Sequence, residues 1–155
     1  MEYASIERTI HIDATPEVVF DVITNPAHIK EWWNGAAFDA EATVGATGEL
    51  VWGDRSSPDS HVEAITVVDA IPPRLFSFRW VYPHGDVASR ANSLLVTFEL
   101  VAHGTGTTLH LTENGFREKG WERAAAEAAF LDHVRGWDLY VPAIGEYVAR
   151  LMASR

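Results

Sequence analysis

Residues 130–151 read FLDHVRGWDLYVPAIGEYVARL, and this stretch decides the fold. Its apolar side chains recur at alternating steps of four and three, at Phe130, Val134, Trp137, Val141, Ile144, Val148 and Leu151. That spacing puts them on one face of an α-helix. The alanine-rich residues before Phe130 extend the pattern. It therefore predicts a helix over about 119–152, with a kink at Pro142 because proline removes one backbone hydrogen bond.

The part of the chain before this helix carries the alternation of half-buried strands, with turn residues in between. The pattern predicts strands over 5–12, 49–53, 62–69, 75–82, 94–101 and 107–113, and a weaker one over 38–43. Two short helices interrupt it after the first strand. Thr15 and Pro16 open one helix that stops at Asn25, and the other covers 26–33.

Only one long helix is available to cover the apolar face of these strands, so the sheet must curl around it. The order of elements predicts an α+β helix-grip fold. It consists of a curved antiparallel sheet of six to seven strands wrapped around the C-terminal helix, with two short helices after the first strand. The 155 residues fit a single domain over 1–155.

Composition excludes several classes of function. Asp and Glu outnumber Lys and Arg by 22 to 12, and the resulting net charge of −10 repels nucleic-acid phosphates and anionic membranes. Cysteine is absent from the sequence, and the seven histidines form no metal-binding motif. We expect no metal, no cofactor, no nucleic-acid partner and no membrane. The first residues, Met1 to Ser5, contain no targeting signal, which predicts a cytoplasmic protein.

Six motifs are spread along nearly the whole chain, namely Ala14 to Phe20, Glu31-Trp32-Trp33, Pro72 to Trp80, Val96 to Leu100, Leu109 to Phe116, and Gly136-Trp137 with Leu139 and Tyr147. In this order they resemble the START-like (SRPBCC) superfamily. The last motif is similar to the branch related to the activator of the heat-shock-protein-90 ATPase. The resemblance implies an apolar cavity between the sheet and the long helix.

Aromatic side chains dominate the elements that would surround this cavity. The residues that we expect to bind a ligand there are Trp33, Phe38, Trp52, Phe76, Phe78, Trp80, Phe98, Glu113, Phe130 and Trp137. The alternative is that the aromatic members simply fill a core, because periodicity does not distinguish a filled core from a hollow one.

Glu113 is the unusual member of this set. It follows Leu109 and Leu111 at steps of two, so its carboxylate is predicted to point inward with two leucines. A buried carboxylate needs a hydrogen-bond partner, a water or a ligand. The alternatives are a strand that ends early and releases Glu113 to solvent, or a structural hydrogen bond. His133 flanks the apolar stripe of the helix. We expect a solvated helix histidine there, and the alternative is a histidine that reaches the cavity.

These observations favour a protein that binds a small hydrophobic or amphipathic molecule, rather than an enzyme. One alternative is a cyclase-like or dehydratase-like enzyme that uses Glu113 as its acid or base. It lacks a second polar group that the sequence places in the cavity. The other is a chaperone-associated interaction module. The sequence leaves the ligand and the oligomeric state open, with a homodimer among the alternatives.

Overall fold

The computed structural model describes residues 5–154. The outer bounds of the predicted domain, 1 and 155, lie outside the described residues. So do residues 1–4, on which the prediction that no targeting segment is present depends.

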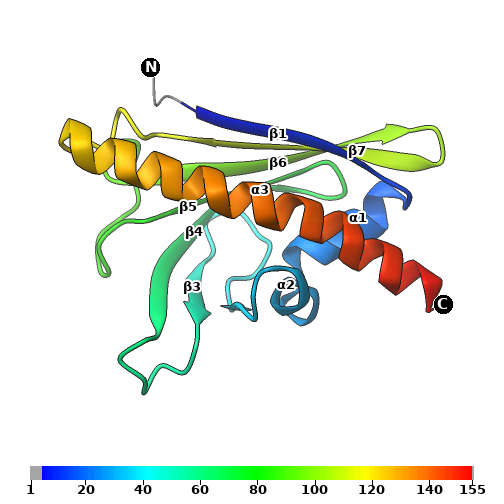
Figure 1. The fold of residues 1–155 in the computed structure, drawn as a ribbon, viewed down its shortest axis with the longest axis horizontal. Helices are drawn as coiled ribbons and strands as arrows, with labels where there is room; N and C mark the ends of the chain where they lie inside the picture. The colour runs from blue at the N-terminus through cyan, green and yellow to red at the C-terminus, as the bar shows by residue number, and fades with distance from the viewer. Residues whose placement is uncertain (1–4, 155) are drawn as a thin grey trace.

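Seven antiparallel strands form one sheet in the order β1-β7-β6-β5-β4-β3-β2 (Figure 1). The strands are β1 (Ser5–Ile12), β2 (Ala37–Phe38), β3 (Thr47–Trp52), β4 (His61–Ile71), β5 (Leu75–Trp80), β6 (Leu94–His103) and β7 (Gly106–Asn114). The register between β4 and β5 shifts between Val67 and Asp69. A bulge of this kind bends a strand and increases its twist, which helps the sheet to curve.

Two short helices follow β1. Thr15 caps α1 (Pro16–Thr24), since its hydroxyl accepts a hydrogen bond from the Val18 amide at 3.4 Å. Asn25 ends α1 and caps α2 (Pro26–Trp32), with its side-chain oxygen 3.0 Å from the Ala27 amide nitrogen. Proline at the first position suits both helices because that amide has no partner inside a helix.

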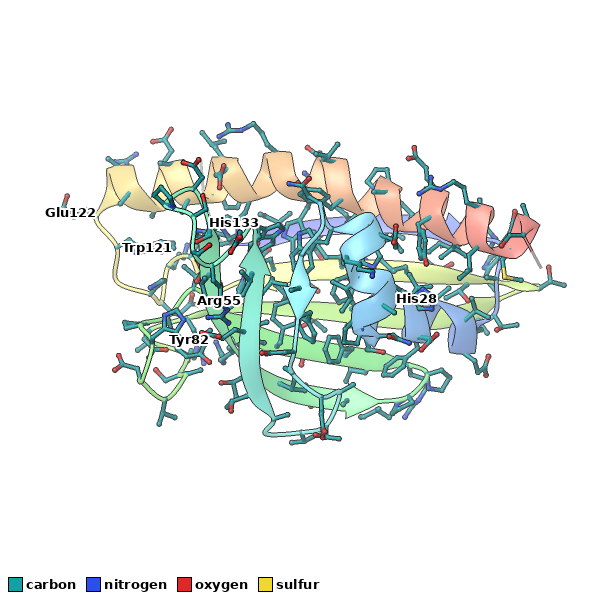
Figure 2. The ribbon with its side chains drawn as sticks, turned by 90° about the horizontal axis from the view of Figure 1, so that it is seen from below. His28, Arg55, Tyr82, Trp121, Glu122 and His133 are labelled. Atoms are coloured by element: carbon teal, nitrogen blue, oxygen red, sulfur yellow. The ribbon has the colours of Figure 1, made fainter. Side chains whose placement is uncertain are left out.

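The long helix α3 (Arg123–Ala153) lies across the sheet and packs against β1, α1 and α2 (Figure 1). Five residues of the predicted stripe are buried, and Val134 and Leu151 pack against the core at its edge. The helix continues through Pro142 to Ala153. No sharp bend is visible in either view of it, in contrast to the kink that the proline predicts (Figures 1 and 2).

Most element boundaries differ from the sequence prediction by a few residues, and two of these differences have a cause in the backbone. Val81 has a φ of 59°, so β5 ends at Trp80 rather than at residue 82. Gly120 has a φ of 76°, so α3 begins at Arg123 and not near residue 119. The segment predicted as a strand over 38–43 pairs with β3 only at Ala37–Phe38. The helix-grip fold that the sequence predicts, with six to seven strands, is confirmed, and the described residues form seven.

Candidate functional site

A pocket of about 420 Å³ opens between α3, the end of α2 and the strands β3, β4 and β5. The helix contributes about half of its wall. The lining residues are Trp33, Asn34, Trp52, His61, Glu63, Trp80, Val81, Asp132, His133, Arg135, Gly136, Trp137, Leu139 and Tyr140.

Four tryptophans from four different segments form the apolar part of this wall. The ring of Trp33 lies 5.6 Å from that of Trp52, 5.5 Å from that of Trp80 and 5.4 Å from that of Trp137. Trp33, Trp80 and Trp137 are only 4%, 7% and 3% exposed, whereas Trp52 is half-buried. The first three therefore make a packed floor, and Trp52 stands at the opening.

Each of these tryptophans is placed by the end of an element or by a helical face. Trp33 follows α2 directly, and the next two residues, Asn34 and Gly35, turn the chain with φ values of 53° and 75°. Trp52 is the last residue of β3, and its indole nitrogen donates to the Trp33 carbonyl at 3.0 Å. Trp80 is the last residue of β5.

Glu113 lies directly behind the tryptophan floor and is 0% exposed. Its position on β7 pairs with Ile6 of β1 and Val96 of β6, so a strand flanks Glu113 on each side. The alternation with Leu109 and Leu111 predicts this inward direction correctly. The alternative in which Glu113 escapes to solvent is wrong.

Three side chains donate hydrogen bonds to the Glu113 carboxylate. The Trp80 indole nitrogen lies 2.7 Å from Oε2. The Trp137 indole nitrogen and Nδ1 of His133 lie 2.8 Å and 2.7 Å from Oε1. A buried carboxylate is stable when donors replace the water that it has lost. Glu113 therefore ties β7 to β5 and α3 and fixes the orientation of two pocket tryptophans.

His133 adopts the alternative position that the sequence leaves open, because it lines the pocket. The preferred expectation of a solvated helix histidine is wrong, since the side chain is only 16% exposed and binds Glu113. Figure 2 shows it on the sheet side of α3, well apart from His28 on α2. His133 follows Phe130 by three residues and precedes Trp137 by four. It therefore shares their face of the helix, and this spacing is the signal that could have identified it.

The environment of His133 changes its pKa. Burial alone disfavours the imidazolium form, but the hydrogen bond and the charge of Glu113 outweigh burial. With smaller contributions from Asp132 and Glu63, they raise the pKa of His133 above its ordinary value of 6.5. The pocket therefore contains a histidine that is a stronger base than a free one.

This raised pKa predicts a pH dependence of stability. A histidine with a higher pKa in the folded than in the unfolded chain stabilises the fold below the unfolded pKa, and that contribution is lost as pH rises through the folded pKa. We expect the free energy of unfolding to fall between pH 6 and the alkaline side of the His133 pKa. Urea denaturation across this range measures it.

The His133→Gln variant is the control for this pH dependence. Its amide group can still donate to Glu113, but it does not titrate. The variant should therefore lose the part of the pH dependence that is due to residue 133. An unchanged pH profile in the variant would contradict the assignment.

The ten residues that the sequence predicts for ligand binding divide into three groups in the structure. Trp33, Trp52, Trp80 and Trp137 come together and line the pocket. Glu113 does not line the pocket itself, but it accepts hydrogen bonds from Trp80 and Trp137, which do. The remaining five are packed in the core and do not line the pocket, namely Phe38, Phe76, Phe78, Phe98 and Phe130.

The polar rim of the pocket is what the sequence analysis missed. Glu63 lies 2.7 Å from Nε2 of His61, and Asp132 lies 3.7 Å from Arg135. The periodicity of the strand and of the helix places each of these residues on the polar face of its element, and residues on such a face are usually exposed to solvent. Between residues 5 and 154, no group of three or more potential ligands is arranged to hold a metal ion. None of the helices described is long and apolar enough to cross a membrane.

Comparisons with known proteins agree with this architecture. Residues 13–149 match the family described as "Activator of Hsp90 ATPase homolog 1-like protein". Among solved structures, protein MLL2253 from Mesorhizobium loti is 23% identical with a TM-score of 0.73, over 94% of this chain and 97% of that one. The Aha1 dimer from Colwellia psychrerythraea is 17% identical with a TM-score of 0.66, over 92% and 93%.

A third solved structure is DynU16, described as a putative protein in the dynemicin biosynthetic locus. It is 18% identical with a TM-score of 0.71, over 94% of this chain but only 47% of that one. At these identities the likeness to solved structures shows the fold alone. No curated protein matches the sequence.

Proposed function

The chain belongs to the activator of Hsp90 ATPase homolog 1-like family, and on that premise we propose that it binds a small hydrophobic or amphipathic molecule in the tryptophan-lined pocket. The observation that carries the proposal is a pocket of about 420 Å³ with four tryptophans in its wall. Ligand sites have volumes of roughly 300–1,000 Å³ and are mostly apolar, with few polar groups.

The shape of the pocket favours a flat ligand. Indole rings offer broad apolar faces, and aromatic ligands gain both area burial and ring contacts on such faces. Leu139 on α3 is 63% exposed at the edge of the pocket and extends its apolar surface outward. A two-ring or three-ring molecule that lies along α3 suits these features better than a compact polar one.

A fluorescence titration with N-phenyl-1-naphthylamine tests the proposal. This neutral probe brightens in apolar surroundings and accepts energy from tryptophan, so binding next to the tryptophan floor gives a saturable signal. Gly136→Leu is the matched variant. A Cβ atom at Gly136 would have only Tyr140 Cδ2 within 4 Å, at 4.0 Å, so a side chain there fills the pocket without displacing backbone.

We expect Gly136→Leu to weaken probe binding by about tenfold or more, because the leucine occupies the space of the ligand. The fold should persist, since leucine favours a helix more than glycine does. Gly145→Ala is the control on the same helix. Its Cβ would lie 3.6 Å from Ile10, outside the tryptophan pocket, and should leave binding unchanged. Equal binding to wild type and Gly136→Leu would contradict the proposal.

The enzyme alternative gains one specific observation. It requires a second polar group beside Glu113, and His133 is in contact with Glu113 and lines the pocket. The hydrogen-bonding groups of the Glu113–His133 pair therefore bear on which ligands the pocket can bind.

A further inference from the structure

His133 presents one ring nitrogen to Glu113 and has the other available. Nδ1 makes the hydrogen bond to Glu113, and Nε2 has no hydrogen-bond partner among residues 5–154. Within the same residues, every fully buried side-chain nitrogen and oxygen has a partner, so Nε2 is accessible from outside. Because His133 lines the pocket, a ligand there can reach this nitrogen.

Glu113 also fixes the chemical form of that nitrogen. A carboxylate accepts hydrogen bonds only, so Nδ1 must carry a proton. In the neutral imidazole, Nε2 is then a lone-pair acceptor. The aromatic rings of Trp80 and Phe116 pack edge-to-face against the imidazole ring, with centroid distances of 5.4 Å and 5.6 Å. The pocket thus contains an oriented base.

We infer that His133, held by Glu113, selects flat aromatic ligands that carry an acidic hydroxyl group, and that this hydroxyl shares its proton with Nε2. The inference rests on the proposed function, since it concerns the same pocket. When the proton transfers, the O–H bond of the ligand breaks and an N–H bond forms at Nε2. The ligand oxygen keeps the electron pair, and the imidazolium lies between two negative oxygens.

The charges around the pocket favour a neutral hydroxyl over a permanent anion. Glu63 and Asp132 on the rim, and the net charge of −10, oppose the approach of an anion. A neutral hydroxyl enters without this cost and ionises only where the histidine stabilises it. The raised pKa of His133 brings it closer to that of a phenol, which strengthens the shared hydrogen bond.

Two probes of the same shape test the inference. 2-Naphthol carries the hydroxyl, and 2-methoxynaphthalene carries a methyl ether that has no proton to share. Each is titrated against N-phenyl-1-naphthylamine by displacement. We expect wild type to bind 2-naphthol about tenfold more tightly, the size of one well-placed hydrogen bond.

The pH profile of wild type provides a test that needs no variant. At pH values between the pKa of His133 and that of 2-naphthol, free His133 has no proton on Nε2 and free 2-naphthol keeps its hydroxyl proton. The complex contains this same single proton, so the affinity does not change with pH. Below the pKa of His133, formation of the complex must release the proton on Nε2, and above the pKa of 2-naphthol it must take up a proton. The affinity therefore falls on both sides. The charged groups that face His133 are Glu113 from β7, Glu63 from β4 and Asp132 from α3, with His61 and Arg135 on the same pocket wall.

The His133→Gln variant should bind both probes alike, because it keeps a donor for Glu113 but has no base. His103→Gln, at the exposed end of β6 and outside the pocket, is the matched control and should keep the preference for 2-naphthol. Equal affinities in wild type, or a preference that survives in His133→Gln, would overturn the inference and leave the proposed function standing. If neither 2-naphthol nor the indicator binds, the proposed function fails with it.

Discussion

Replacement of Glu113 by alanine is expected to lower the free energy of unfolding by about 3–5 kcal/mol. Alanine removes the acceptor for both indole nitrogens and for Nδ1 of His133. Trp80 and Trp137 are almost completely buried, so their N–H groups would find no water in exchange. Each buried donor that loses its partner costs roughly 1–3 kcal/mol, and the loss of the side chain leaves a cavity as well.

The Glu113→Gln variant separates charge from shape. The amide fills the same volume, but one of its two polar ends is a donor that faces other donors. We therefore expect the free energy of unfolding of Glu113→Gln to lie between that of wild type and that of Glu113→Ala. Glu99→Ala, at an exposed position on the neighbouring strand β6, is the control and should change stability by less than about 0.5 kcal/mol. Urea denaturation measures all three variants. A loss for Glu113→Ala as small as that for Glu99→Ala would show that the network contributes little.

The sequence predicts the direction of Glu113 but not its partners, and the reason is physical. Direction follows from the two-residue period of a single strand, which Leu109 and Leu111 already establish. The donors come from β5 and from α3, at residues 80, 133 and 137. Their meeting depends on the register of the sheet and on the rotation of the helix, neither of which local periodicity specifies.

The same limit explains why five predicted phenylalanines lie in the core while four predicted tryptophans line the pocket. All nine are aromatic residues in buried phases. Phe76 and Phe78 lie within β5 with paired strands on both sides, whereas Trp80 ends that strand and Trp52 ends β3. After Trp80 the chain leaves the strand at Val81, so β5 provides no further residue to cover that end of the aromatic cluster. Trp80 therefore borders the pocket.

Replacement of Trp33 by alanine is the second change with a large expected effect. Trp33 stacks on Trp32 at 5.1 Å and contacts the rings of Trp52, Trp80 and Trp137. Loss of a buried tryptophan costs about 3–5 kcal/mol, through lost contacts and the cavity that remains. Trp121→Ala is the matched control. Trp121 is half-buried and does not line the pocket, and it contacts Phe116, so its replacement should cost less than that of Trp33.

The cavity left by Trp33→Ala joins the pocket, and this gives the variant a second, more specific outcome. Indole has the shape of the missing side chain, so it should bind in the enlarged space and restore stability as its concentration rises above its dissociation constant. Thermal denaturation with and without indole measures this restoration. The Trp121→Ala variant should show no such gain beyond that of wild type. If indole stabilises both variants alike, then Trp33 does not form the floor of an accessible site. If it rescues only Trp33→Ala, a flat two-ring molecule reaches the tryptophan floor from solvent.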